Sequence, residues 1–211
     1  MTRRIIRPLG LTGTVMPGND PSLPQPHGLY HSGVLQPGHP LGIWDATLIN
    51  PSMGPGTGDA ISTNADLIIF LRALLGGRLL PPALLTQMRT LHPVWQETDE
   101  DLAYHYTPEQ TGGEPEVEYA VRGVTGQYGL GITKRTFTCP NGSPVAVWGH
   151  NGAIPGSLSY AYVTEDGSRA LAFNVNGDWP ARVHKYDPNA FQPSELIMFY
   201  DVMRAEFCTP A

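Results

Sequence analysis

Residues 145–175 read VAVWGHNGAIPGSLSYAYVTEDGSRALAFNV, and this stretch holds three short apolar runs separated by turn residues. The runs cover 145–148, 157–163 and 168–175, and each is typical of a β-strand. The last two are joined by Thr164-Glu165-Asp166-Gly167, in which the Asp-Gly pair is a strong hairpin signal. The stretch therefore predicts an antiparallel sheet.

One helix is expected to pack on this sheet. Tyr128–Ile132 leads into a further strand, so we expect the sheet to occupy 126–176. Residues 194–207 then predict a terminal helix. Its apolar face consists of Leu196, Ile197, Tyr200 and Met203. Strands followed by a packed helix indicate an α+β fold, with the helix on one face of the sheet.

The first half of the chain has a different character. Residues 8–58 carry nine Pro and ten Gly, and we expect irregular loops there. Residues 59–91 predict a helical region. In it Thr63 fits a helix N-cap, with Asp66 as the acidic residue three positions later.

Composition limits the classes of function. The chain has 211 residues, of which 15% are charged, a net charge of −6 and a pI near 5.6. This balance argues against nucleic acid as a partner, because its phosphate backbone is bound by clustered Lys and Arg. The acidic stretch 96–125 is interpreted as a solvated surface insertion. No run reaches about 18 apolar residues, as a membrane span would need. No apolar stretch follows the basic N-terminus, so it is not interpreted as a secretion signal.

A complete active site is not found in the sequence. Neither Gly-x-Ser-x-Gly nor Ser-x-x-Lys nor Tyr-x-Asn occurs. The Ser-x-Asn at Ser62–Asn64 sits at a predicted helix start, where these residue types cap. His27 and His31 lie in a loop without the Glu of a zinc pattern, and the glycines of 54–58 lack the Lys of a phosphate loop. We therefore expect no metal and no cofactor.

One segment of the chain indicates a functional site more strongly than the patterns above. Trp148–Gly156 lies where one predicted strand ends and the next begins. Glycine in a strand leaves room for a ligand backbone to approach, and His150 can donate, accept or hold charge near neutral pH. The residues alone leave two interpretations open: a ligand-binding strand edge, or a glycine-rich hairpin connection with an incidental histidine.

His150-Asn151-Gly152 resembles the third motif of the serine penicillin-interacting enzymes, which is Lys-Thr-Gly in many members and His-x-Gly in others. Arg4–Leu11 resembles the segment after the family's Tyr-x-Asn motif. Ile61–Leu67 resembles its Ser-Thr-x-x-Asp-Leu helix start, and Tyr128–Gly131 the strand before the third motif. The branch that the chain resembles is the secreted D-alanyl-D-alanine carboxypeptidases, beside class C β-lactamases and related esterases.

The resemblance implies a serine hydrolase mechanism that acts on peptide, β-lactam amide or ester bonds. In the family a Ser attacks the substrate carbonyl and forms an acyl-enzyme, while a Lys and a Tyr manage its proton. Here His150 takes the place of the motif's basic residue, and Asn151 that of the Thr that binds the substrate carboxylate. Gly152 would let the substrate backbone approach, and Ala153 would supply the second oxyanion N–H.

Two departures concern recognition of a substrate carboxylate. In the carboxypeptidases a hydroxyl residue follows the motif's Gly, and an Arg follows Tyr-Gly-Leu-Gly by two. Those positions hold Ala153 and Thr133 here. Alternation along a strand puts Lys134 on the opposite face from Thr133. Amidase, esterase or β-lactamase-like specificity therefore stays open.

The cysteines fit the same branch, in which similarly placed cysteines form a disulfide. The resemblance thus implies a bond between Cys139 and Cys208, closing a loop of about 70 residues and worth roughly 4 kcal/mol. Two unpaired thiols are the alternative. A disulfide suits an oxidising compartment, and the family implies an extracellular or cell-envelope location.

The absent motifs are the larger departure. In the family they precede the segment that begins here at Ile5, so we expect residues 1–211 to be the C-terminal portion of a single domain. The expected fold is an incomplete β-lactamase/transpeptidase-like fold with an unpaired sheet edge open to association. Without the nucleophile, the chain is expected to be inactive alone. The alternatives are a non-catalytic remnant that binds peptidoglycan peptides or a partner, and a generic α+β domain.

Overall fold

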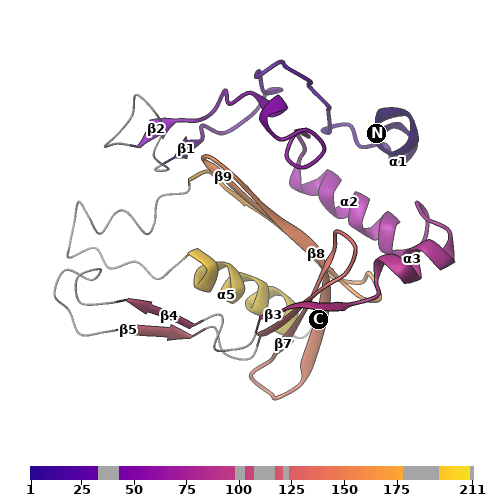
Figure 1. Ribbon diagram of the computed structural model, residues 1–211, viewed down its shortest axis with the longest axis vertical. Helices are drawn as coiled ribbons and strands as arrows, with labels where there is room; N and C mark the ends of the chain where they lie inside the picture. The colour runs from indigo at the N-terminus through magenta and orange to yellow at the C-terminus, as the bar shows by residue number, and fades with distance from the viewer. Residues whose placement is uncertain (33–42, 98–102, 107–116, 121–123, 178–194, 210–211) are drawn as a thin grey trace. The chain divides into compact units, whose positions relative to one another are not determined.

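The computed structural model describes residues 1–32, 43–97, 103–106, 117–120, 124–177 and 195–209 (Figure 1). The chain divides into two compact units. The first comprises Met1–Leu85, Gly149–Val163 and Ala170–Asp178, and the second comprises Thr86–Trp148, Thr164–Arg169 and Trp179–Ala211. No described helix is long and apolar enough to cross a membrane.

The sheet of the first unit is formed by three strands. They are β8 (Pro144–Ile154), β9 (Ser157–Thr164) and β10 (Ala170–Val175), with β9 between the other two. β8 enters this unit at Gly149. β9 and β10 are antiparallel over Leu158–Val163, as the sequence predicts. The rings of the paired residues Tyr160 and Phe173 stack with centroids 5.0 Å apart.

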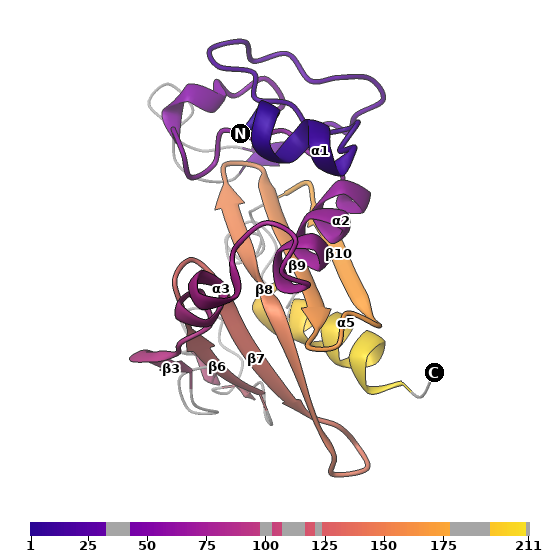
Figure 2. The same ribbon diagram turned by 90° about the vertical axis from the view of Figure 1, so that its right-hand side faces the viewer.

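Helix α2 (Asn64–Leu75) packs on these strands (Figure 2). Its N-cap is Thr63, whose hydroxyl accepts a hydrogen bond from the backbone N–H of Asp66 at 3.2 Å, as predicted. Leu71 forms a buried cluster with Ala161 and Val163. Apolar side chains that surround this cluster are Leu67, Phe70, Leu75, Ala170 and Ala172.

The carboxylate of Asp66 binds residues of the N-terminal loop. Its Oδ2 accepts hydrogen bonds from the backbone N–H of Gly13 at 2.9 Å and the hydroxyl of Thr14 at 2.7 Å. The side chain thereby ties the N-terminal loop to the start of α2. A buried carboxylate needs such partners because its desolvation would otherwise cost several kcal/mol.

The rest of the first unit contains short elements joined by irregular loops, as expected for 8–58. The elements in 1–88 besides α2 are η1 (Thr2–Ile6), α1 (Arg7–Leu9), β1 (His31–Ser32), β2 (Trp44–Asp45), η2 (Pro51–Met53) and α3 (Pro82–Met88), the last shared with the second unit. Gly10 ends α1 with a positive φ of 66°, which glycine adopts without a Cβ penalty.

The second unit holds four neighbouring strands and a helix. The strands follow the order β3, β6, β7 and the first part of β8. Their bounds are His92–Glu97 for β3, Val124–Tyr128 for β6 and Thr133–Thr138 for β7, and the helix is α5 (Glu195–Cys208). β6 is antiparallel to both β3 and β7.

Short strands also occur in the acidic stretch 96–125, whose composition predicts a solvated surface insertion. β4 (Ala103–Tyr106) and β5 (Val117–Ala120) form an antiparallel pair, and β3 ends and β6 begins within the stretch. Pairing with a partner distant in the sequence determines these strands, and composition alone does not reveal it.

Helix α5 packs on one face of this sheet. Along β7 the buried residues alternate as Thr133, Arg135 and Phe137. The ring of Phe137 lies 6.4 Å from those of Tyr200 and Phe207 in α5. The predicted terminal helix and its apolar face are therefore confirmed at Tyr200 and Met203, which are almost fully buried.

Candidate active site strand

The three residues of the predicted third motif and Ala153, which follows them, lie inside strand β8 and not in a hairpin connection. His150, Asn151, Gly152 and Ala153 all precede the strand's last residue, Ile154, and the connection to β9 is Pro155-Gly156. The strand is longer than the sequence predicts, because glycines are typical of turns and so suggest an earlier end. Among the described residues the glycines with positive φ do not include Gly149 or Gly152, so both continue the strand.

These two glycines have opposite surroundings. A Cβ added at Gly149 would lie 1.9 Å from the carbonyl oxygen of Ala161 in β9. A Cβ added at Gly152 would meet no atom within 4 Å. Gly149 therefore lets two backbones approach, whereas Gly152 borders open space. The neighbours of Gly152 differ in exposure: the side chains of His150 and Ala153 are exposed, and that of Asn151 is half-buried.

The imidazole of His150 is oriented by the backbone of the next residue. Its Nδ1 forms a hydrogen bond with the carbonyl oxygen of Asn151. His27 makes the same kind of contact with the carbonyl oxygen of Gly28, at 2.8 Å. Nothing in the sequence indicates this contact, because it depends on the rotamer of a side chain in an extended strand.

A loop of the first unit packs against the end of β8. Gly156 has a φ of 80°, and a Cβ there would lie 2.9 Å from the Cβ of Ala46. A Cβ added at Gly58 would likewise lie 3.4 Å from the side chain of Ile154. Figure 2 shows this loop, drawn in purple, beside the β8–β9 connection. Nothing in the sequence indicates that Ala46 is a neighbour of the segment Trp148–Gly156.

Strands β1 and β2 hold part of this loop. His31 and Asp45 are directly paired across them. Hydrogen bonds from the side chain and the backbone of Thr47, with a smaller contribution from His31, hold the pKa of Asp45 below its usual value. The backbone N–H of Thr47 donates to Asp45 Oδ1 at 2.8 Å. Asp45 is therefore engaged in a local turn.

In the second unit, Trp148 lies under two cations. The Arg89 guanidinium is 4.6 Å from the ring centroid and the Lys134 ammonium is 5.5 Å from it. Arg89 also forms an ion pair with Glu165. Lys134 is half-buried between the buried Thr133 and Arg135, so it lies on the opposite face of β7, as alternation predicts.

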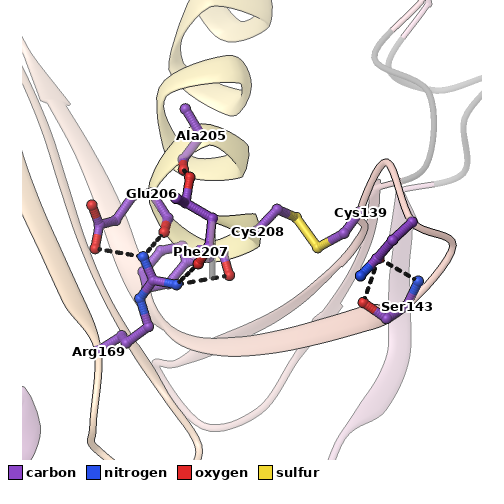
Figure 3. Close-up of a disulfide and its surroundings, with 9 residues drawn as sticks. Cys139, Ser143, Arg169, Ala205, Glu206, Phe207 and Cys208 are labelled. Atoms are coloured by element: carbon purple, nitrogen blue, oxygen red, sulfur yellow. Dashed lines mark hydrogen bonds and ion pairs between the residues drawn. A yellow bond between two sulfur atoms is a disulfide. The ribbon is translucent and has the colours of Figure 1, made fainter. Parts of the chain in front are cut away.

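The disulfide implied by the resemblance is present. Cys139 and Cys208 are bonded, with their Cα atoms 5.3 Å apart and 69 positions apart in sequence (Figure 3). The bond joins the residue that follows β7 to the last residue of α5. It therefore links the C-terminal end of the helix to the sheet that this helix covers.

Arg169 reinforces the same helix end. Its guanidinium donates to the carbonyl oxygens of Glu206 and Thr209, and to that of Phe207 at 3.4 Å (Figure 3). It also forms an ion pair with the Glu206 carboxylate at 3.3 Å. The last carbonyls of a helix lack intrahelical donors, and a cation there interacts favourably with the helix dipole.

Among the described residues, no group of three or more His, Cys, Asp or Glu side chains could hold a metal ion. The His27–His31 pair belongs to separate local contacts, since His27 bonds to Gly28 and His31 pairs with Asp45. Ser62 and Asn64 flank the helix cap Thr63, which agrees with the capping interpretation of that segment.

Comparison with known proteins defines the class. The β-lactamase family model matches residues 1–191, and the chain belongs to this family. A D-stereospecific amidohydrolase from Streptomyces sp. is 34% identical with a TM-score of 0.67, over 100% of this chain and 48% of that one. The α+β fold is thus a β-lactamase-like fold, of which the chain matches about half.

Two further solved structures share the fold. The D-amino acid amidase from Ochrobactrum anthropi SV3, complexed with D-phenylalanine, is 24% identical with a TM-score of 0.55, over 83% of this chain and 44% of that one. A penicillin binding protein from Bacillus halodurans is 17% identical with a TM-score of 0.54, over 89% and 45%. The chain spans about half the length of each of these proteins.

Proposed function

We propose that this chain is the C-terminal portion of a serine hydrolase that cleaves amide, peptide or ester bonds through an acyl-enzyme. Family membership supports the reaction class. The 34% identity with a D-stereospecific amidohydrolase favours an amide bond at a D-configured residue over the D-alanyl-D-alanine carboxypeptidase and class C β-lactamase alternatives. The observation that carries the proposal is the open space beside Gly152, in the same strand in which Gly149 leaves no room for a side chain.

In this proposal β8 is the strand along which the substrate lies. Gly152 lets the substrate backbone approach, because no Cβ occupies the space beside it. The exposed Ala153 supplies a backbone N–H to the developing oxyanion. Asn151 donates from its amide to the acyl group, and His150 takes part in the proton network. These roles follow from the resemblance of this strand to the family's third motif.

The 211 residues contain neither Ser-x-x-Lys nor Tyr-x-Asn, so in this proposal they supply one wall of the site and no nucleophile. We therefore propose that this chain alone binds substrate without turnover. The disulfide supports a location in an oxidising compartment, the cell envelope or the exterior. The ligands are small amides or esters, or peptidoglycan stem peptides.

Two measurements on the purified chain test this function. A labelled penicillin should leave no acyl adduct in the intact mass. The acyl-D-amino acid amide N-acetyl-D-phenylalaninamide should shift the backbone amide resonances of Asn151–Ala153 without being hydrolysed. A Gly152→Ala variant should lose the shifts while keeping its fold, since the added methyl fits the free chain. A stoichiometric adduct, or shifts that persist in Gly152→Ala, would contradict the proposal.

A further inference from the structure

Strand β10 lies at one end of the strand order, so among the described residues no strand pairs with its outer side over Ala170–Val175 (Figure 2). Its inner side pairs with β9. The outer side of an edge strand presents backbone N–H and C=O groups that can pair with a further strand. This edge is therefore a candidate interaction surface.

The hydrogen bonds of the β9–β10 hairpin determine which residues of β10 face outward. Next to the turn, the backbone N–H of Thr164 donates to the carbonyl oxygen of Arg169 at 2.9 Å. Hydrogen-bonded and non-hydrogen-bonded pairs alternate along an antiparallel ladder, so the adjacent pair, Val163 and Ala170, is a non-hydrogen-bonded one. The backbone groups that point away from β9 therefore belong to every second residue, here called the outward residues: Ala170, Ala172 and Asn174.

Two contacts elsewhere in the sheet agree with this assignment. The carbonyl oxygen of Asn176, the next residue in the outward series, accepts a hydrogen bond from the backbone N–H of His31 at 3.1 Å. On the other side of β9, the carbonyl oxygen of Ala161 points toward Gly149 of β8, as it must if Ala161 makes no hydrogen bond with its paired residue Ala172. Within the described part of the chain, the outer side of β10 is thus engaged at Asn176 and open at the outward residues before it.

We propose that this edge pairs with the same edge of a second copy of the chain, as an antiparallel pair of β10 strands centred on Ala172. In this register Ala172 lies opposite its own counterpart, and Ala170 lies opposite the second copy's Asn174. Each outward N–H group then donates to an outward carbonyl oxygen of the other copy, around a single two-fold axis. The inference goes beyond the proposed function, because it involves no residue of the motif in β8.

The composition and the length of the edge favour a second copy as the occupant. Residues 170–175 are Ala-Leu-Ala-Phe-Asn-Val, without the charges or proline by which proteins usually block an edge strand. The outward residues lie between Arg169, next to the turn, and Asn176, where His31 is bound. A strand of equal length, which the second copy supplies, fills this interval without displacing His31. Because the pairing is two-fold, it closes at the dimer.

The first test measures the mass and the amide exchange of the purified chain at several concentrations. In analytical ultracentrifugation the mass should rise from 22.9 kDa toward twice that value as the concentration increases. Hydrogen exchange of the outward residues should slow only where the dimer forms. The amides of 171, 173 and 175, which face β9, should be protected at every concentration.

Three results of this first test would overturn the proposal. One is a monomer at all concentrations. Another is a dimer in which the outward amides exchange as fast as in the monomer, since a different surface would then form the contact. The third is protection of the outward amides at every concentration, because another part of the same chain would then cover the edge.

A pair of variants at Asn174 isolates the backbone donor. Asn174→Pro removes one outward N–H from each copy, and a proline is tolerated where the N–H of an edge strand faces outward. Asn174→Ala is the matched control, because both variants lose the side-chain hydrogen bonds to Ser157 and Ser159 but the alanine keeps its N–H. The proline variant should dimerise at least about tenfold more weakly than the control, as expected for the loss of two hydrogen bonds. Equal association would overturn the proposal, and if the proline variant does not fold, the exchange pattern of the unaltered chain decides.

The register is tested in a mixture of isotope-labelled and unlabelled chains. The proposed pairing places Leu171 opposite the second copy's Phe173 as a non-hydrogen-bonded pair, whose Cα atoms lie about 4.5 Å apart. An intermolecular nuclear Overhauser effect between the Hα atoms of these two residues should therefore appear in the dimer. Its absence in a sample shown to be dimeric, or contacts that join each residue to its own counterpart all along the strand, would overturn the antiparallel register.

Discussion

A Cβ at Gly149 would sit 1.9 Å from the carbonyl oxygen of Ala161, and 2.8 Å from the Cα of Tyr162. These are backbone atoms of the paired strand, which cannot move aside as a flexible side chain could. The paired strand thus leaves no room for a side chain at the residue immediately before His150. This contact fixes the path of β8 just where the motif begins.

Gly149→Ala should therefore destabilise the fold by about 1–3 kcal/mol, the usual cost of overpacking a closely packed site. Chemical denaturation followed by circular dichroism measures this as a lower midpoint at an unchanged slope. Gly152→Ala is the matched control, since it adds the same methyl group in the same strand where no atom lies within 4 Å. Equal midpoints for the two variants would show that the strands do not approach as described.

The disulfide should carry a large share of the stability of α5. Replacing Cys139 and Cys208 together by alanine removes a link between residues 69 positions apart, which the chain-entropy model values at roughly 4 kcal/mol. We expect a matching fall in the free energy of unfolding, reproduced in the unaltered chain by a reductant. Alkylation followed by intact mass analysis checks the starting state: the untreated chain should take up no label, and labelling before reduction would contradict the bond.

Local signals in the sequence were sufficient for the hairpin β9–β10 and for the two long helices. The Asp166-Gly167 turn, the Thr63 cap and the apolar face of the terminal helix each act within a few residues, so each can be recognised without knowing the fold. The end of β8 could not be located in this way. Whether Gly149 ends a strand or continues it depends on Ala161, twelve residues away in the paired strand.

The residues of the candidate site likewise divide into those that a sequence motif reveals and those that depend on distant parts of the chain. His150–Ala153 were found through the resemblance of a motif, and the disulfide partners came from the same resemblance. The packing of Ala46 against Gly156 and the contact from Asp66 to Thr14 were missed, because both join residues more than fifty positions apart.

Arg169 should stabilise the C-terminal turn of α5 independently of the disulfide. Arg169→Ala removes donors to the carbonyls of Glu206, Phe207 and Thr209, and should cost about 1–2 kcal/mol, since the carbonyls of a helix end are then left to water. Hydrogen exchange should be faster in the last turn of α5 and unchanged in α2. Arg78→Ala is the control, because Arg78 is exposed and has no known side-chain contact among the described residues. An equal effect of both variants would contradict this role.

Asp166 in the β9–β10 turn should make stability depend on pH in the acid range. Its carboxylate accepts from the hydroxyl of Thr164 at 2.6 Å, and from the backbone N–H and hydroxyl of Ser168. These hydrogen bonds, that of Thr164 first, lower its pKa from 3.8 to about 2. Because the folded pKa is the lower one, the contribution is complete above 3.8 and is lost as the pH falls toward 2.

Asp166→Asn isolates the charge, because the amide oxygen still accepts the same hydrogen bonds. The difference in unfolding midpoint between the unaltered chain and Asp166→Asn should stay constant from about pH 7 to pH 5 and then shrink toward about pH 2. A carboxyl ¹³C titration should place the Asp166 midpoint well below that of an unperturbed aspartate. A midpoint at the ordinary value, or a stability difference that grows as the pH falls, would show that the turn does not hold the carboxylate in its charged form.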